Sequence, residues 1–178
     1  MNSFCIDINL DISPLRDEID INSFPKEYWN TIPISDINPK LIIFLMRHGL
    51  GLPKAATFYS EGEIVHPIHI DGASVSDMVK INWAYGDNHT MNWYSTAINK
   101  QASTENIDRT YIYYKSSEVK LIHSQKVDCP SLVQVGVPHN VINYSGSRRC
   151  ISVALFHIHT NQHVTMQEAL TLFSKIID

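Results

Sequence analysis

The sequence predicts a mainly β protein, a sandwich or barrel with helices packed on its outside. Its 178 residues, 44% hydrophobic and 18% charged, are enough for one buried core and too few for two ordinary domains. Short β-type runs separated by turn-forming residues fill the middle of the chain, whereas helical patterns occur only near its two ends. We therefore expect a single domain over 1–178, with an N-terminal helical support over 1–52, a β core over 53–158 and a C-terminal helix over 164–177.

The N-terminal support contains one predicted helix. Asn38 is a suitable N-cap, Pro39 fits the first helical position, and the apolar run Leu41–Met46 follows before Gly49 ends the pattern. A buried strand is the alternative for this run, because periodicity alone does not separate a short buried helix from a strand.

The β core begins with predicted strands at Ala55–Tyr59 and Ile64–Ile70. The stretches Met78–Gly86 and Thr90–Ser95, separated by the polar turn 87–89, are typical of a hairpin. The remaining predicted strands are Thr110–Tyr114, Val119–His123, Ser131–Val137, Val141–Tyr144 and Cys150–Ile158.

The C-terminal segment has the clearest helical pattern in the chain. Thr165 and Glu168 have the spacing of a capping box, and the apolar residues that follow, through Ile176, recur at helical spacing. We expect a structural helix that covers one face of the sheet.

Composition disfavours several classes of protein. The net charge of −4, with no basic run longer than Arg148–Arg149, argues against an extended nucleic-acid surface. No apolar run approaches the ~20 residues of a membrane helix, so no membrane association is expected. The three cysteines, Cys5, Cys129 and Cys150, lack CxxC spacing and indicate neither a disulfide framework nor a thiolate zinc site. A reducing, cytoplasmic location is the expectation.

Three residues are candidates for a metal site. His69 and Asp71 are two positions apart, so in a strand both side chains point to the same side and can reach one ion. His139 follows the rigid Pro138 and precedes an apolar strand, which makes it a suitable third ligand. Two imidazoles and one carboxylate leave the opposite face of a metal open, an arrangement typical of non-heme Fe(II) oxygenases.

An arginine nine residues after His139 is a candidate partner for a carboxylate. Arg148 lies at the edge of an apolar strand and can bind a carboxylate through two hydrogen bonds, which suits the far end of a dicarboxylic co-substrate. Strand alternation places Arg148 with Cys150 and Ser152 on one side and Arg149 on the other. The polar side fits a pocket better, so we choose Arg148. Arg149 is the alternative, and a solvated turn containing both arginines is a second one.

Taken in order, three segments carry a family resemblance. HIDG (69–72), PHNVIN (138–143) and RRCISVALF (148–156) resemble the His-x-Asp…His…Arg signature of the 2-oxoglutarate- and Fe(II)-dependent oxygenases, and the last segment is similar to that of prolyl-hydroxylase-like members. The resemblance covers about residues 53–157. It implies a double-stranded β-helix, that is, a jelly-roll or cupin-like barrel, whose mouth holds the metal.

The resemblance also implies residue roles and a reaction. His69, Asp71 and His139 would ligate Fe(II), and Arg148 would pair with the distal carboxylate of 2-oxoglutarate. Asn82 resembles an asparagine that would hydrogen-bond the co-substrate, with an ordinary edge-strand polar residue as the alternative. No catalytic residue beyond the metal ligands is implied. The reaction would consume 2-oxoglutarate and O2, hydroxylate a substrate and release succinate and CO2.

Two other functions stay open at this point. One is a non-catalytic jelly-roll module with a binding or structural role, because fold alone does not establish chemistry. The other is a cupin-type metalloenzyme that does not use 2-oxoglutarate; the missing downstream Glu of the usual cupin pattern counts against it. The substrate, a small molecule or a peptidyl group, is not indicated. Few insertions separate the core strands, so the site is open or is completed by a second subunit in a homodimer.

Further histidines offer alternative metal ligands. His66 could replace His69, although Asp71 pairs by spacing with His69. A zinc site built from His157, His159 and His163 is a minor alternative, because solvated histidines are common where a strand leaves a barrel.

Overall fold

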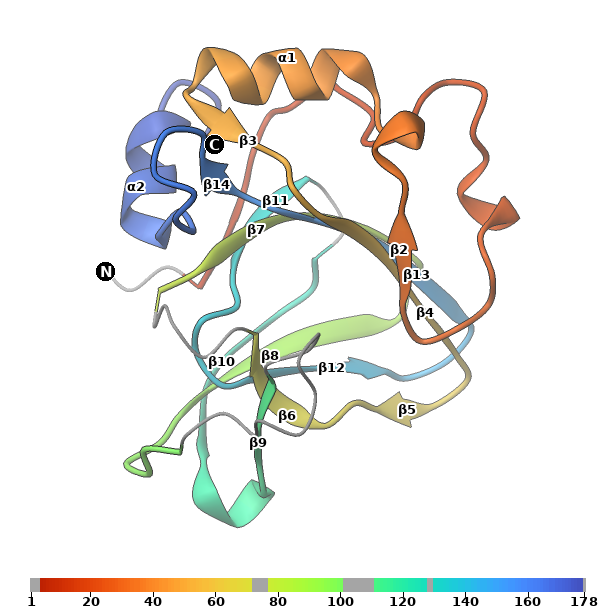
Figure 1. Ribbon diagram of the computed structural model, residues 1–178. Coiled ribbons are helices and arrows are strands. Elements are labelled where there is room, and N and C mark those ends of the chain that lie inside the picture. The colour runs from red at the N-terminus through yellow and green to blue at the C-terminus, as the bar shows by residue number, and fades with distance from the viewer. Residues whose placement is uncertain (1–3, 72–76, 101–110, 128–129, 178) are drawn as a thin grey trace.

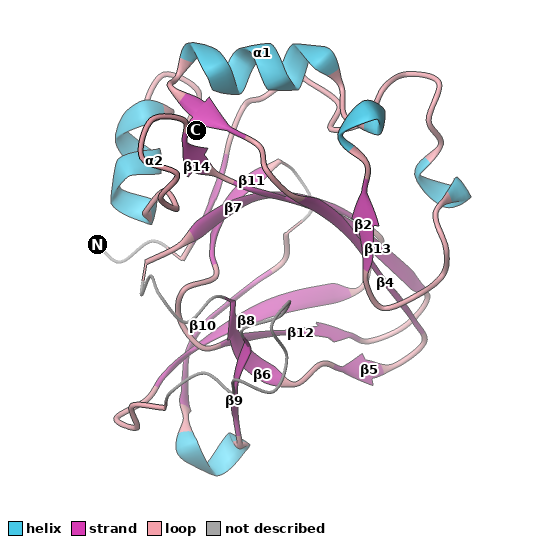
Figure 2. Cartoon of the chain, viewed as in Figure 1, coloured by secondary structure: helices cyan, strands magenta, loops and turns pink. Residues whose placement is uncertain are grey.

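Two antiparallel β-sheets face each other across the interior of a barrel, and both helices lie on the outside of one sheet (Figure 1). The structure is a computed structural model that describes residues 4–71, 77–100, 111–127 and 130–177. Strands make up most of its regular secondary structure (Figure 2). The mainly β prediction is therefore confirmed.

The first sheet has six strands, each antiparallel to its neighbours. In spatial order they are β1 (Cys5–Asp7), β11 (Ser131–Gln134), β7 (Val79–Tyr85), β13 (Ser147–Ala154), β4 (Ala55–Glu61) and β2 (Asn30–Ile32).

The second sheet has five strands in its main path, and the short β5 (Ile64–Val65) pairs with one of them. In spatial order they are β10 (Lys120–Gln125), β8 (His89–Ser95), β12 (His139–Asn143), β6 (Ile68–Asp71) and β9 (Tyr111–Tyr114).

The connections between the sheets define the fold. The chain passes from β4 to β6, from β7 to β8, and from β11 through β12 to β13, and it changes sheet at each of these steps. Antiparallel strands wound between two sheets in this way form a jelly roll, or double-stranded β-helix. The predicted fold class is confirmed by this strand order.

The α-helices of the described ranges are α1 (Pro39–Arg47) and α2 (Met166–Leu172). Asn38 caps α1 by accepting a hydrogen bond from the Lys40 amide at 3.0 Å, and Thr165 with Glu168 forms the predicted capping box of α2. The second helix is shorter than the predicted 164–177. Beyond its C-cap the chain pairs with the N-terminal segment, where the Asn9 amide donates to the Ile176 carbonyl at 2.6 Å, and this pairing replaces further helical turns.

The N-terminal 52 residues are less helical than predicted. Besides α1 they contain two 3-10 turns and three short strands, of which β1 and β2 form the two edges of the first sheet. The third, β3 (Leu50–Gly51), pairs with β14 (Phe156–His157) in a separate two-stranded sheet.

Several strand boundaries differ from the predicted ones. The strand predicted at Ile64–Ile70 is divided into β5 and β6 around Pro67, which has no amide proton for the ladder. His89, predicted as a turn residue, belongs to β8, and β12 begins at His139 rather than at Val141. The last predicted strand is divided into β13 and β14. Gly72, Thr110 and Cys129, which the sequence predictions also included, lie outside the described residues.

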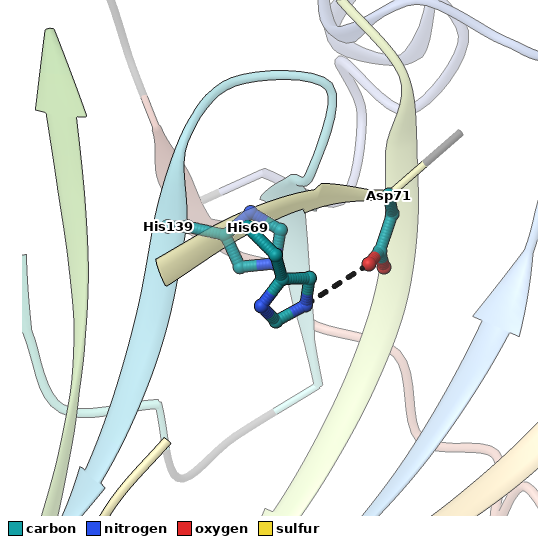
Figure 3. Close-up of side chains that lie close together, drawn as sticks. All are labelled: His69, Asp71 and His139. Atoms are coloured by element: carbon teal, nitrogen blue, oxygen red, sulfur yellow. Dashed lines mark ion pairs between the residues drawn. The ribbon is translucent and has the colours of Figure 1, made fainter. Parts of the chain in front are cut away.

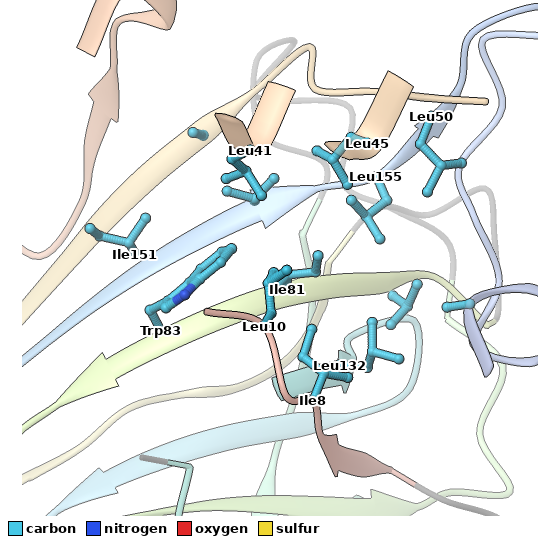
Figure 4. Packing of buried hydrophobic residues seen from close by; sticks show 14 of the residues in the cluster. Ile8, Leu10, Leu41, Leu45, Leu50, Ile81, Trp83, Leu132, Ile151 and Leu155 are labelled. Atoms are coloured by element: carbon cyan, nitrogen blue, oxygen red, sulfur yellow. The ribbon is translucent and has the colours of Figure 1, made fainter. Parts of the chain in front are cut away.

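The main hydrophobic core lies between the first sheet and the helices (Figure 4). Leu41 and Leu45 of α1 and Ile81, Trp83 and Ile151 of the sheet are all buried in it. Because alternate residues of a strand face opposite sides, the neighbours of these sheet residues point into the barrel. In the part of the chain that the structure describes, no helix has the length and hydropathy that a membrane crossing requires.

Candidate metal centre

The three predicted ligands lie close together (Figure 3). His69 and Asp71 belong to β6, and His139 begins β12, where it is the direct cross-strand partner of His69. One ligand atom from each residue lies within 4.8 Å of the other two. Among the described residues, this is the one group of three or more His, Cys, Asp or Glu side chains that is close enough to hold an ion.

Both imidazoles are oriented by the backbone. The Nδ1 atom of His69 lies 2.9 Å from the Pro67 carbonyl, and Nδ1 of His139 lies 2.9 Å from the Val137 carbonyl. Since a carbonyl only accepts, each Nδ1 carries the proton and donates it. The proton-free position of each neutral ring is then Nε2, which is the tautomer that a metal ligand requires.

The carboxylate of Asp71 is almost fully buried, with 7% of the residue exposed. Its Oδ2 accepts a hydrogen bond from Lys80 Nζ at 2.7 Å. Its Oδ1 lies 3.1 Å from His69 Nε2 and has no hydrogen-bond partner among the described residues. A buried carboxylate oxygen without a donor is costly, so this atom is suited to a cation.

The charges around the site shift the pKa of each ligand. Burial alone would raise the pKa of Asp71, but the Lys80 ammonium and the two imidazoles outweigh it and hold that pKa well below its usual range. Burial lowers the pKa of His69, but the close contact with the negative Asp71 carboxylate more than reverses this, so the pKa of His69 is raised. Burial and the charge of His69 lower the pKa of His139 to about 4. The site therefore carries one ionised carboxylate and at least one neutral imidazole, a donor set that fits a divalent metal.

A pocket of about 580 Å³, counted out to its open mouth, begins at the three ligands. Four residues that line it, Ser60, Asp71, Asn82 and Arg148, each have a buried polar side-chain atom without a partner among the described residues. Buried polar atoms in proteins are normally satisfied, so their concentration in one pocket indicates a polar ligand.

The structure places the two adjacent arginines on opposite faces of β13. Arg148, 5% exposed, lines the pocket together with Cys150 and Ser152, as strand alternation predicts. Arg149 lies on the other face, with its guanidinium 4.8 Å from the centre of the Tyr59 ring. Of the two, only Arg148 is placed to meet a ligand beside the candidate metal centre.

Two residues near the site were missed by the sequence predictions. Ser60 is the cross-strand partner of Arg148 and lines the same pocket. Lys80 forms the ion pair with Asp71 from β7, where it alternates with the core residues Val79 and Ile81. A lysine at an inward-facing position of an apolar strand was the available signal for it.

The alternative histidines are not part of the centre. His66 lines the pocket, but the group of candidate ligands does not include it. Burial and the charge of Arg148 lower the pKa of His66 to about 4. His157 lies 3.4 Å from Glu168, whereas His163 packs on Phe156, and the structure does not join these histidines with His159 into a metal-ligating group.

Comparison with known proteins yields structural likenesses alone. No family model matches the chain, and no curated protein matches it. Recombinant oxalate oxidase in complex with glycolate is 13% identical, with 86% of this chain and 62% of that chain covered and a TM-score of 0.38. The capsular polysaccharide assembling protein CapF from Staphylococcus aureus is 9% identical, with 63% and 26% covered and a TM-score of 0.29.

Peruvianin-I, a cysteine peptidase from Thevetia peruviana latex, is 12% identical, with 93% and 96% covered and a TM-score of 0.33. The chain thus spans less than two thirds of the first two of these proteins. The fold assignment rests on the strand order given above. On that basis, the chain is a jelly-roll protein with a candidate metal centre of two histidines and one aspartate.

Proposed function

We propose that this protein is a 2-oxoglutarate- and Fe(II)-dependent oxygenase that hydroxylates its substrate and releases succinate and CO2. The observation that carries the proposal is the position of Arg148, a buried cation in the same pocket as the three candidate metal ligands. A pocket with a metal centre and a buried guanidinium is suited to an anionic ligand that can bind to the metal and to the guanidinium at once.

His69, Asp71 and His139 would hold Fe(II). The two histidines supply their Nε2 nitrogens, and Asp71 supplies Oδ1, which has no hydrogen-bond partner among the described residues. Two nitrogens and one oxygen are the donor set of non-heme oxygenases. When bound, Fe(II) with 2-oxoglutarate and O2 supplies the oxidising chemistry. Lys80 keeps Oδ2 of Asp71 occupied, so it leaves Oδ1 as the carboxylate oxygen for the ion.

Arg148 and Ser60 would bind the distal carboxylate of the co-substrate. Arg148 forms no ion pair with a carboxylate of the described residues, and its Nε has no hydrogen-bond partner there. A buried, uncompensated guanidinium strongly favours an anionic partner, and it can bind a carboxylate through two parallel hydrogen bonds. The Ser60 hydroxyl, directly across the ladder from Arg148, adds a further donor.

The remaining pocket residues suit the middle of a small dicarboxylate. Asn82 offers a buried amide to the pocket, and Met91, Val135 and Val141 add apolar lining. Such a lining excludes water from the ligands and strengthens their electrostatic interactions.

The test is 2-oxoglutarate-dependent formation of succinate by the full chain supplied with Fe(II) and O2. The wild-type protein should form succinate, and Arg148→Met should bind 2-oxoglutarate about tenfold or more weakly, since a charge-assisted hydrogen bond contributes ~1.5–3 kcal/mol. Binding of Mn(II) should be nearly unchanged. Arg149→Met is the matched control, because it removes the same side chain from the opposite face.

Three results would contradict the proposal. If the two arginine substitutions weaken 2-oxoglutarate binding equally, Arg148 does not bind the co-substrate. Metal binding without any binding of 2-oxoglutarate would favour a cupin-type metalloenzyme, and absence of both would favour a non-catalytic module.

A further inference from the structure

A second cavity meets the first at Asp71. It measures about 980 Å³ out to its open mouth, and it shares Phe58, Asp71 and Ser152 with the pocket assigned above to the co-substrate. An ion on Asp71 would therefore be reached from both cavities. If the first cavity holds 2-oxoglutarate, the second is the space that a substrate can occupy beside the metal.

The charged side chains of this second cavity are mainly basic. Lys80, Lys54 and His163 line it, and Asp71 is the one acidic residue among its described lining. The ammonium of Lys80 has three N–H donors, of which one is donated to Asp71. The Nδ1 atom of His163 is buried without a hydrogen-bond partner among the described residues. The two lysine ammonium groups leave several N–H donors for an incoming anion.

The charges of the loaded site would also favour an anion. Fe(II), Arg148 and Lys80 would contribute four positive charges, and 2-oxoglutarate and Asp71 three negative ones, so the loaded site would carry one net positive charge. Lys80, with 16% of its side chain exposed, is the cation of this group that lines the second cavity. An excess positive charge in a partly buried site is unfavourable, and a bound anion would relieve that cost. Lys54, which is exposed at the same cavity, adds a second positive charge.

The walls of the cavity are aromatic. Trp29, Phe58, Tyr111 and Phe156 line it, and the ring of His163 lies on that of Phe156 with 3.9 Å between ring centres. Flat apolar surfaces of this kind suit a ring or another flat apolar group.

We infer that the second cavity binds the substrate, and that this substrate has an anionic group, a carboxylate or a phosphate, attached to a flat apolar body. The anion would lie at Lys80 and Lys54, and the apolar body would pack against the aromatic walls. This inference rests on the proposed function, because it takes the first cavity as the co-substrate site.

The test uses the full chain loaded with Mn(II) and N-oxalylglycine in place of Fe(II) and 2-oxoglutarate, so that no turnover occurs. The probes are 3-phenylpropanoate, 3-phenylpropyl phosphate and the neutral 3-phenylpropanamide, each titrated by calorimetry. Paramagnetic relaxation of the probe protons by Mn(II) reports whether the probe binds beside the metal. We expect the anionic probes to bind about tenfold more tightly than the amide. The tighter of the two anions identifies the carboxylate or the phosphate as the preferred group.

Two lysine variants assign the effect to the cavity. Lys54→Ala should reduce the preference for the anionic probes severalfold, whereas Lys40→Ala, which removes an exposed lysine of α1, should not. If Mn(II) and N-oxalylglycine bind but the amide binds as tightly as the anions, or if both lysine variants behave alike, the inference is wrong and the proposed function stands. If Mn(II) or N-oxalylglycine fails to bind, the proposed function fails, and the inference fails with it.

Discussion

Replacement of Lys80 by methionine should destabilise the metal-free protein far more than the metal-bound one. Lys80 Nζ lies 2.7 Å from Asp71 Oδ2, and the two side chains are only 16% and 10% exposed. Removal of one partner from a buried ion pair typically costs ~3–5 kcal/mol, because the other charge is left uncompensated. Partial exposure places the expected loss for metal-free Lys80→Met at the lower end, about 3 kcal/mol.

A bound divalent ion should compensate most of that loss. The ion would lie against Asp71 and supply the positive charge that the lysine no longer provides, so the loss should fall to about 1 kcal/mol, the order of a single hydrogen bond. Binding and folding are linked, so the difference of about 2 kcal/mol must appear as tighter metal binding. Lys80→Met should therefore bind Mn(II) about 30-fold more tightly than the wild type, since each ~1.4 kcal/mol is a factor of ten.

Urea unfolding with and without saturating Mn(II) measures the two losses, and calorimetry measures the Mn(II) affinity independently. Lys54→Met is the control, because Lys54 lines the neighbouring cavity and forms no ion pair with Asp71 among the described residues. Equal destabilisation of Lys80→Met in both conditions, with unchanged Mn(II) affinity, would refute the assignment of Asp71 as a ligand.

Three further predictions address the ligands, the co-substrate pocket and the core. His139→Ala should weaken Mn(II) binding by more than the ~10–100-fold that loss of an outer-shell partner costs, because it removes a direct ligand; unchanged affinity in calorimetry would exclude His139. Ser60→Ala should weaken 2-oxoglutarate binding about tenfold without lowering the ligand-free melting temperature, since its hydroxyl has no partner among the described residues; a lowered melting temperature would show a structural role. Leu45→Ala, at a fully buried position of α1, should lower the free energy of unfolding in urea by ~2–5 kcal/mol and leave Mn(II) affinity unchanged. A loss of Mn(II) affinity would mean that packing between the helices and the first sheet controls the metal site.

Strand periodicity explains why much of the site could be predicted. His69 and Asp71 share a face because they are two residues apart, and Arg148 and Arg149 are separated because they are adjacent. Such relations are local and can be worked out from a short segment. The pairing of His139 with His69 is different, because it joins strands 70 residues apart in the chain. The position of His139 after Pro138 made it a candidate ligand, and the order of the motifs in the family resemblance strengthened that prediction.

The parts that sequence reasoning missed depend on long-range packing. Lys80 was overlooked because its significance comes from Asp71, which lies on the opposite sheet. The edge strands β1 and β2 contain three residues each, too few for a period-2 pattern to be recognised. The second cavity is formed by segments from Trp29 to His163, so no contiguous motif could indicate it.

The three candidate ligands are held in two different ways, and this difference determines how the site can be tuned. The histidines are each fixed by a backbone carbonyl two residues earlier, with Pro67 and Pro138 restricting the chain at those points. Side-chain substitutions elsewhere should therefore change their positions little. Asp71 is instead held by another side chain, that of Lys80, which also lies at the second cavity. An anion bound to Lys80 would draw its charge away from Asp71 and make the carboxylate a stronger ligand. Occupancy of the second cavity should then tighten metal binding, and by linkage the metal should tighten the binding of the anion to the same extent.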